Sequence, residues 1–350
     1  MYKLILEEVS CTDDLLPFTA TRSVLDIRMG ILTFREKWSR LLGAGHFELG
    51  SGPALPANCL PTRALAARVH EEFARGPIEQ GSIDRLITHG RLIRLPWHIF
   101  QHNAEALFED FELVTAGRGS QPIPSFVLAI RPEAIFIEEG ARLGPCVLNA
   151  SAGPIYIARD AEIMEGSLIR GPFAACEGAV VKMGAKVYGA TTLGPGVTVG
   201  GELKNVVLFG YSNKGHDGYL GDSVIGEWCN LGAGTSASNL KNNAGEIRVW
   251  HPASAEYLPA GMKCGLLMGD YSRSAINTSF DTGTVVGVCC NVFGDTRPPK
   301  YLRNFTWGQG DGLRYEWDKA VRDIGNWKKM KGRSFTDAEM LILKHIFDQH

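Results

Sequence analysis

The sequence predicts a parallel β-helix joined to a smaller α/β domain, and a six-residue repeat is the main reason. From residue 157 to 201, an aliphatic or small residue returns at every sixth position: Ile157, Ile163, Ile169, Ala175, Val181, Val187, Leu193 and Val199. Four residues after each comes a second, mostly small position: Ala161, Ser167, Phe173, Ala179, Ala185, Thr191, Val197 and Leu203. A period of six is neither helical nor a simple strand alternation. Short strands joined by corners, three units to a coil, would stack these residues into an apolar column.

The first 125 residues lack this period and read as a mixed α/β domain. Residues 3–6 form a short apolar run typical of a strand, and Trp38, Leu41 and Leu42 lie on one face of a predicted helix. Residues 96–111 indicate a second helix. His98 and His102 are four residues apart there without a further ligand nearby in sequence, so we expect packing or capping rather than metal binding.

Glycines and prolines at residues 117–124 indicate a linker before the repeat. The tail after the repeat is aromatic and ends in an amphipathic helix that should begin near residues 334–337. We therefore predict an α/β domain over residues 1–125, a β-helix over 126–296 and an aromatic, helical C-terminal tail over 297–350.

Composition limits the function classes. A formal net charge of -2 gives no electrostatic reason to expect nucleic acid or an anionic membrane as partner. No apolar run approaches the roughly 18 residues of a membrane span. The eight cysteines are scattered without a C-x-x-C pair, which favours reduced, packed thiols. We expect a cytoplasmic protein with small-molecule substrates and without nucleic-acid or membrane partners.

The six-residue period fails after Lys204, where we predict a polar loop over residues 211–219 before the repeat resumes at Leu220. His216 lies in this loop between Gly215 and Asp217. A neutral imidazole there could take a proton from an attacking amine. A loop histidine alone is more often structural than catalytic, so its neighbours decide the interpretation.

Those neighbours resemble the acetyltransferase half of the bifunctional GlmU enzymes. Residues 212–235 are similar to the family pattern S-x-x-G-H-x-x-Y-L-G-D-x-x-I-G-x-x-x-N-x-G-A-G-T, which is followed shortly by an asparagine. The resemblance implies a left-handed β-helix that forms a homotrimer and binds acetyl-CoA where coils of neighbouring subunits meet. It further implies that His216 is the general base toward the amine of glucosamine 1-phosphate.

The same resemblance implies the other site residues. Tyr219 and Asn230 would contact the amino sugar, Lys204 and Lys186 its phosphate, and Ala233 and Asn239 the acetyl-CoA. Direct transfer would need no nucleophilic serine or cysteine. The amine attacks the thioester, His216 takes its proton, and a backbone N–H or a polar side chain stabilises the oxyanion.

The N-terminal half resembles short, divergent GlmU-like sugar nucleotidyltransferases. The similar motifs are Pro17-Phe18-Thr19-x-Thr21-Arg22, Asp26-x-Arg28-x-Gly30-Ile31-Leu32-Thr33 and Glu36-Lys37-Trp38. The resemblance implies nucleotidyl transfer from UTP to a sugar 1-phosphate with Mg²⁺, and guanidinium and ammonium groups suit phosphate oxygens. Arg22, Arg28 and Lys37 would then bind the nucleotide. A solvated cationic helix face is the alternative for these side chains.

Two features of the N-terminal half leave its activity open. The glycine-rich fingerprint of ordinary pyrophosphorylases is absent, since the first strand is followed by Glu7-Glu8-Val9-Ser10. The metal ligands are unknown among candidates that include Asp26, Asp84 and Asp110. One alternative is therefore a nucleotidyltransferase alone, such as a glucose-1-phosphate thymidylyltransferase. Another is a trimeric β-helix scaffold with a non-catalytic sugar-nucleotide-binding domain.

Overall fold

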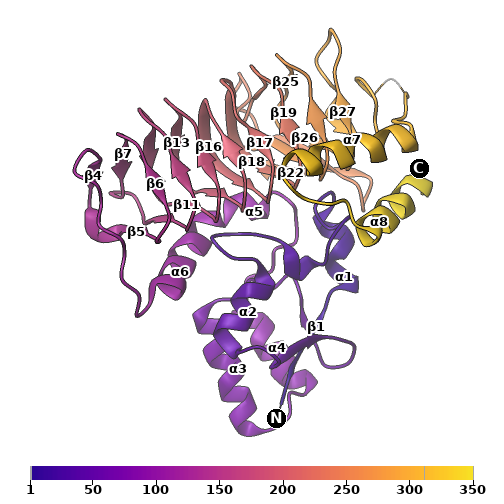
Figure 1. The fold of residues 1–350 in the computed structure, drawn as a ribbon. Helices are drawn as coiled ribbons and strands as arrows, with labels where there is room; N and C mark the ends of the chain where they lie inside the picture. The colour runs from indigo at the N-terminus through magenta and orange to yellow at the C-terminus, as the bar shows by residue number, and fades with distance from the viewer. Residues whose placement is uncertain (1, 311, 350) are drawn as a thin grey trace.

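The computed structural model describes residues 2–310 and 312–349, and its elements form an N-terminal α/β region, a long β-helix and a C-terminal helical region (Figure 1). The predicted fold class is confirmed. The N-terminal region holds a three-stranded parallel sheet in the order β2-β1-β3: β2 (Phe47–Leu49), β1 (Leu4–Glu7) and β3 (Leu55–Pro56). Its helices are α1 (Val9–Thr12), α2 (Phe34–Leu42), α3 (Arg63–Arg75), α4 (Gln80–His89), α5 (His98–Gln101) and α6 (Asn103–Thr115), with 3-10 turns η1 (Asp13–Leu15) and η2 (Val24–Asp26).

Helix α2 shows why these residues form a helix at this place. Thr33 accepts a hydrogen bond from the backbone N–H of Glu36, and the Glu36 carboxylate accepts one from the N–H of Thr33. This capping box satisfies donors that a helix start leaves free. The helix ends at Gly43, and its inner face buries Phe34, Trp38 and Leu42.

The β-helix has three faces, which we call A, B and C. Face A contains β4 (Leu128–Ile130), β7 (Val147–Asn149), β10 (Leu168–Arg170), β13 (Lys186–Tyr188), the starts of β16 (Glu202–Leu208) and β18 (Tyr219–Ile225), β20 (Ser236–Ala237) and β25 (Ser279–Phe280). Face B contains β5 (Ile135–Ile137), β8 (Ile155–Ile157), β11 (Phe173–Ala175), β14 (Thr191–Leu193), the ends of β16 and β18, β23 (Leu266–Met268), β26 (Thr284–Val286) and β28 (Tyr301–Leu302).

Face C is a parallel sheet of short strands. It contains β6 (Arg142–Leu143), β9 (Glu162–Ile163), β12 (Val180–Val181), β15 (Thr198–Val199), β17 (Asn213–Lys214), β19 (Asn230–Leu231), β24 (Arg273–Ser274) and β27 (Asn291–Val292). A hairpin, β21 (Ile247–His251) with β22 (Glu256–Gly261), projects from the coil between faces A and B. The strands of face B reach past residue 296, which we predicted as the end of the β-helix.

The strand register explains the sequence period. Ile157 pairs with Ala175, and Ala175 pairs with Leu193, so one coil takes eighteen residues. Both predicted sets of repeat positions are buried inside the coil. The hydrophobic effect therefore acts along the whole column, because each coil covers the apolar surface of the next.

The predicted loop after Lys204 is wrong. The chain stays in the coil there, because Val199 of β15 pairs with Lys214 of β17 in a coil three residues shorter. Lys214 is 1% exposed and takes a position that aliphatic residues hold in other coils. Its methylene stem can replace an aliphatic side chain, while its ammonium group reaches the carbonyl oxygens of Gly200 and His216 at the corner.

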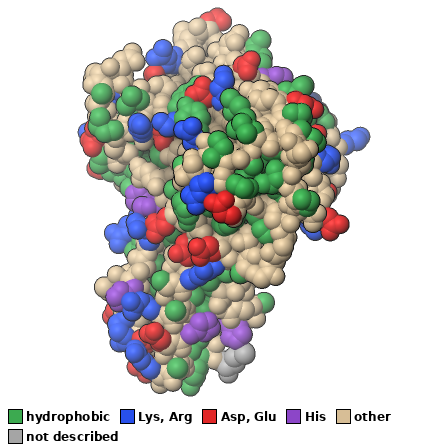
Figure 2. Space-filling view, turned by 90° about the vertical axis from the view of Figure 1, so that its left-hand side faces the viewer, with side chains coloured by type: hydrophobic (Ala, Val, Ile, Leu, Met, Phe, Trp, Pro, Cys, Tyr) green, Lys and Arg blue, Asp and Glu red, His purple; other side chains and the backbone are tan. Residues whose placement is uncertain are grey.

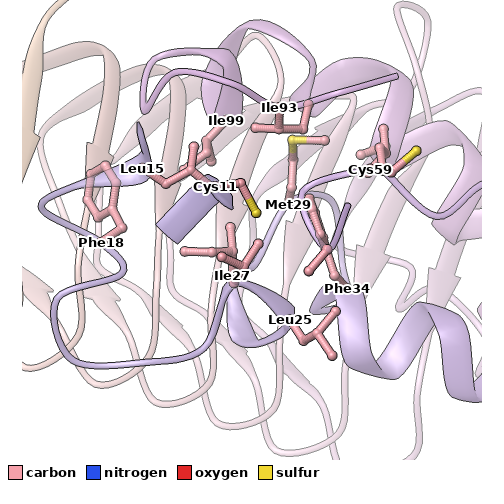
Figure 3. Close-up of a cluster of buried hydrophobic side chains, with 14 of the residues drawn as sticks. Cys11, Leu15, Phe18, Leu25, Ile27, Met29, Phe34, Cys59, Ile93 and Ile99 are labelled. Atoms are coloured by element: carbon pink, nitrogen blue, oxygen red, sulfur yellow. The ribbon is translucent and has the colours of Figure 1, made fainter. Parts of the chain in front are cut away.

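The N-terminal region packs on face B. One apolar cluster joins its core to outward side chains of that face, such as Val207, Val224 and Leu267. Figure 3 shows part of this cluster, with Ile27, Met29 and Ile99 between the N-terminal segments and the β-helix strands behind them. From the β4 end, Figure 2 shows the two regions as an upper and a lower lobe.

The C-terminal helices α7 (Trp317–Met330) and α8 (Asp337–Asp348) cover the corner between faces B and C. Helix α8 begins with a second capping box, formed by Thr336 and Glu339, near the predicted start. Lys331, directly after α7, donates to the carbonyl oxygens of Gly196 (3.0 Å) and Tyr211 (2.9 Å) and to Asn213 Oδ1 (3.0 Å). Over residues 2–310 and 312–349, every helix is too short or too polar to cross a lipid bilayer.

Candidate functional site

A cavity of about 460 Å³ lies beside His216 at the corner between faces C and A, and we call it the His216 pocket. It brings three of the predicted residues together, His216, Asn230 and Ala233. Its other lining residues are Lys182, Thr198, Asn213, Gly215, Leu231, Gly232, Ile276, Trp327 and Met330. Three strands of face C and helix α7 thus form its walls.

The backbone around His216 is held from inside the coil. The buried ammonium of Lys214 donates to the carbonyl oxygen of His216, whereas the imidazole itself is exposed. Burial lowers the pKa of Lys214 to about 8, with an opposing contribution from Asp217. A Cβ added at Gly200 would lie 2.8 Å from the carbonyl oxygen of Gly215, so the two corners are in close contact. Lys214 and Gly200 therefore fix the segment that presents His216.

The predicted phosphate ligands lie on the outside of face A, next to this corner. Register pairs Lys186 with Glu202 and Glu202 with Tyr219, so these three side chains form one row across neighbouring strands. Lys204 lies in the adjacent row with its ammonium 6.0 Å from the ring centroid of Tyr188. Tyr188 donates to Glu202 Oε1 at 2.6 Å. Strands of a sheet are about 4.8 Å apart, so Lys186 and Tyr219 lie roughly 10 Å from each other.

Tyr219 and Asn239 are neighbours, and a buried carboxylate binds the amide of Asn239. Asp222 is 5% exposed and accepts hydrogen bonds from the side-chain amides of Asn205 (2.7 Å) and Asn239. Burial raises the pKa of Tyr219 to about 12, so its phenol is neutral and can donate a hydrogen bond at physiological pH. Asn239 thus lies on the Tyr219 side of the corner, away from the residues that line the His216 pocket.

Two further cavities follow the coil from here. One of about 270 Å³ shares Ile276 with the His216 pocket and continues along the corner past Phe293 and Gly294. The other, of about 710 Å³, lies between Tyr219 and the segment of residues 240–243. Both are lined by Arg297, and the larger one also by Lys241 and Lys300. The surface on this side of the corner is therefore grooved and carries cations.

The predicted nucleotide ligands lie elsewhere, at the contact with face B. Arg22 has its terminal nitrogens in ion pairs with Asp270 and with Glu227, the latter at 3.1 Å. Its guanidinium carbon is 5.1 Å from the centroid of the Phe209 ring, and Thr21 also donates to Asp270 at 2.6 Å. Arg22 therefore joins the N-terminal region to the β-helix.

Lys37 and Arg28 also have intramolecular partners, Lys37 within the N-terminal region and Arg28 next to Cys176 of the β-helix. Lys37 is 1% exposed and pairs with Asp110, whose carboxylate also accepts from the backbone N–H groups of Ile31 (2.7 Å) and Leu32 (3.0 Å). Burial lowers the pKa of Lys37, and Asp110 opposes this change. Arg28 donates to the carbonyl of Ile31. Nucleotide binding by these three cations stays a prediction. Each already forms ion pairs or hydrogen bonds within the chain, although Nε of Arg22 is buried and forms no hydrogen bond with any described residue.

The side chains present do not fit the implied Mg²⁺ site. Both carboxylate oxygens of Asp26 are bound by Arg35, Asp110 is buried against Lys37, and Asp84 is exposed on α4. Within the described residues, no three His, Cys, Asp or Glu side chains are grouped so that they could hold a metal ion. Oxygen ligands from several side chains are what Mg²⁺ and Ca²⁺ sites require.

His98 and His102 agree with the expectation of packing. Their ring centroids are 5.7 Å apart, and burial lowers the pKa of His98 to about 4. A neutral, half-buried imidazole next to Trp97 is consistent with a structural side chain.

Sequence analysis missed the contribution of α7 to the site. Trp327 and Met330 line the His216 pocket, although their sequence position is about 110 residues from His216. A signal was present, since Ala320, Ile324 and Lys328 are buried and recur at every fourth position, as on a helix face.

Comparisons with known proteins agree with both resemblances. Residues 4–53 match a family model described as sugar nucleotidyl transferase. The bifunctional protein GlmU of Methanocaldococcus jannaschii is 33% identical over 89 residues, which cover 25% of this chain and 21% of that protein. A bifunctional sugar-1-phosphate nucleotidylyltransferase/acetyltransferase of Sulfurisphaera tokodaii is 32% identical over 93 residues, 26% of this chain and 23% of that protein. GlmU of Thermus thermophilus is 32% identical over 138 residues, 32% of this chain and 30% of that protein.

The chain thus spans less than a third of the length of these relatives in the matched segments. The similarity to GlmU-like sugar nucleotidyltransferase/acetyltransferases is confirmed at this level. The relatives are bifunctional transferases by name, which supports a transferase here.

Proposed function

We propose that this GlmU-like chain is an acetyl-CoA-dependent N-acetyltransferase that acts on an amino-sugar 1-phosphate, with glucosamine 1-phosphate as its substrate. The observation that supports this most is the His216 pocket, which unites His216 with Asn230 and Ala233 from neighbouring coils. These are three residues of one family motif, and they line one cavity although the chain between His216 and Ala233 passes through all three faces of the coil.

The proposed reaction is a direct transfer. The amine nitrogen of the sugar attacks the thioester carbonyl, the C–N bond forms, and the C–S bond breaks with release of the CoA thiol. His216 takes the proton from the nitrogen as general base. Asn230 offers an amide that can orient the acceptor or bind the developing oxyanion. The eight cysteines are buried, and burial raises the pKa of thiols such as Cys146 to about 11, which disfavours an acyl-cysteine intermediate.

The acceptor phosphate would bind on face A. Lys186 and Lys204 lie in adjacent rows beside the corner, and the neutral phenol of Tyr219 can donate to a sugar hydroxyl or phosphate oxygen. Acetyl-CoA would follow the grooved surface from Ala233 past Ile276, with Asn239 near its path and the cations Arg297 and Lys300 available to its phosphates.

The assembly would be a homotrimer of a cytoplasmic protein, as the resemblance implies. Face B is covered by the N-terminal region and part of face C by α7, so face A remains for contact between copies. The exposed Leu128 and Leu168 lie on that face. A trimer contact there would place the grooves of one copy against another.

Nucleotidyl transfer from UTP to the sugar 1-phosphate is a second candidate activity, supported by the family-model match over residues 4–53. Because the carboxylates present do not fit a Mg²⁺ site, we derive no catalytic step for it. Release of pyrophosphate from UTP or dTTP with glucose 1-phosphate or N-acetylglucosamine 1-phosphate, in the presence of Mg²⁺, tests this activity.

The acetyltransferase proposal is tested by release of free thiol from acetyl-CoA with glucosamine 1-phosphate. We expect turnover by the wild type and a loss of about 10²–10⁴-fold in kcat for His216→Ala, the range for removal of a general base. The control is His345→Ala, because His345 is an exposed histidine on α8, away from the pocket. No thiol release by the wild type, or equal rates for wild type and His216→Ala, would contradict the proposal.

A further inference from the structure

Helix α7 covers a second, smaller cavity next to the His216 pocket. Its volume is about 210 Å³, and it is lined by Arg273, Asn291, Tyr315, Asp323, Asn326 and Trp327. Trp327 forms a wall of both cavities. Arg273 pairs with Asn230 in the register of face C, so it lies one strand from a residue of the His216 pocket.

Arg273 is a buried cation without a hydrogen-bond partner on one edge of its guanidinium group. The residue is 8% exposed, and its guanidinium carbon lies 5.6 Å from the centroid of the Trp327 ring. Nε and Nη2 are buried and form no hydrogen bond with any described residue. Buried polar groups are almost always satisfied, and an unsatisfied charged donor has a high cost.

Those two nitrogens are the ones that other arginines of this chain use to bind carboxylates. Arg35 places Nε 2.6 Å from Asp26 Oδ1 and Nη2 3.1 Å from Asp26 Oδ2. Arg85 binds both oxygens of Glu72 with the same pair of atoms, at 3.1 and 2.7 Å. In Arg273 the same bidentate edge is free, and it matches two oxygens of one anionic group.

The carboxylate nearest in the cavity lining is already engaged. Asp323 accepts a hydrogen bond from the hydroxyl of Tyr315 at 2.5 Å, and Arg322 lies 3.6 Å from its other oxygen. No ion pair of Arg273 occurs within the described part of the chain. The cavity therefore contains a cation whose charge its own side chains do not neutralise.

We propose that Arg273 forms a binding site for an oxyanion, a phosphate or carboxylate group that accepts from Nε and Nη2 together. A water molecule occupies about 30 Å³ in the liquid, so the cavity has room for such a group with some water. The amides of Asn291 and Asn326 offer further donors, and Trp327 holds the guanidinium from its face. The group belongs either to a free anion or to a ligand that also occupies the His216 pocket across Trp327.

The test is isothermal titration calorimetry on the full-length protein at constant ionic strength. Inorganic phosphate and acetate probe the free anion, and glucosamine 1-phosphate probes an anionic group attached to a pocket ligand. The variants are Arg273→Gln, which removes the bidentate edge, and Arg273→Lys, which keeps the charge but not the edge. Arg322→Gln is the matched control, because Arg322 is an exposed arginine of α7, the helix that covers the cavity.

We expect saturable binding of at least one probe to the wild type and to Arg322→Gln, and at least tenfold weaker binding to both Arg273 variants. Dependence on Arg273 for glucosamine 1-phosphate alone would identify the pocket ligand as the source of the anion, and would place its phosphate at Arg273 instead of beside Lys186 and Lys204 on face A. The site is overturned if every probe fails to saturate the wild type, or if the Arg273 variants bind as the wild type does. Neither result bears on thiol release at His216, so the two proposals fail separately. Should Arg273→Gln not fold, Arg273→Lys gives the answer.

Discussion

Two buried arginines of this protein have similar surroundings but different partners. Arg22, between the N-terminal region and face B, and Arg273, beneath α7, each lie within 6 Å of an aromatic ring. Arg22 has the carboxylates of Asp270 and Glu227 as ion-pair partners, and its Nε lacks a hydrogen bond; Arg273 lacks one at both Nε and Nη2 and has no ion pair within the described residues. Paired cations of this kind hold two regions together, and a cation left unpaired in an accessible cavity indicates a ligand. We therefore interpret Arg22 as part of the contact between the two regions and Arg273 as part of a ligand site.

The largest effect should come from the fully buried ion pair of Lys37 and Asp110, which joins α2 to α6 inside the N-terminal region. Asp110→Ala leaves Lys37 without a counterion and removes the acceptor of the Ile31 and Leu32 N–H groups. Breaking a buried pair on one side costs about 3–5 kcal/mol of unfolding free energy. Denaturant titration of Asp110→Ala measures this loss of unfolding free energy. Asp84→Ala, an exposed carboxylate in the same region, should change it by no more than about 0.5 kcal/mol. Equal, small effects of both would contradict a structural role of the pair.

Replacing the two arginines by methionine should have opposite signs. Arg22→Met leaves Asp270 buried without its ion-pair partner, and we expect a loss of about 2–4 kcal/mol in unfolding free energy. Arg273→Met removes a charge that has no carboxylate partner, so the change should be near zero or a gain of about 1 kcal/mol. The same denaturant titration compares both. A loss for Arg273→Met as large as that for Arg22→Met would show that Arg273 is structural.

A smaller effect concerns Lys214, which is buried without a carboxylate in hydrogen-bond contact. Because burial lowers its pKa from 10.5 to about 8, the folded state releases this proton at a lower pH than the unfolded state. Between pH 7 and 9 the unfolded state then binds more protons, and stability from this group rises with pH. The unfolding free energy of the wild type should therefore increase relative to that of Lys214→Met as the pH increases over this range. A difference that stays constant with pH would contradict a lowered pKa.

The smallest effect is expected at the surface. Arg63 and Glu112 form an ion pair at 2.8 Å with both side chains substantially exposed. Such pairs contribute about 0–1 kcal/mol, so Arg63→Ala should leave the midpoint of denaturant unfolding almost unchanged. A loss of unfolding free energy comparable to that of Arg22→Met would mean that burial does not explain why some ion pairs of this protein stabilise it more than others.

The repeat predicted the coil because almost every inward position between residues 157 and 203 is small or aliphatic, and the register confirms its eighteen-residue turn. The same criterion failed at Lys214, since a charged residue counts as polar in any pattern although its stem can pack in a column. Local pattern also predicted α2 and α8 through their apolar faces, and the structure adds a capping box at the start of each. These features depend on neighbours within a few residues.

The arginines and lysines of the N-terminal motif could not be interpreted in this way. Guanidinium and ammonium groups suit phosphates and carboxylates equally, and the carboxylate that Arg22 binds, Asp270, is 248 residues away. The candidate site likewise combines residues that a local motif predicts with residues that it does not. His216, Asn230 and Ala233 belong to one local motif and line one cavity, as the motif suggested, whereas Trp327 and Arg273 reach that region only through tertiary packing.

Lys331 has a consequence for how this protein can change in evolution. Two of the three acceptors of its ammonium group are main-chain carbonyls, at Gly196 and Tyr211. Substitution of a side chain does not remove a carbonyl, so these two hydrogen bonds depend on the backbone path of the corners and on one lysine. The apolar packing of α7 and α8 against residues such as Trp228, Tyr271 and Phe305 is a separate constraint, and it does depend on side chains.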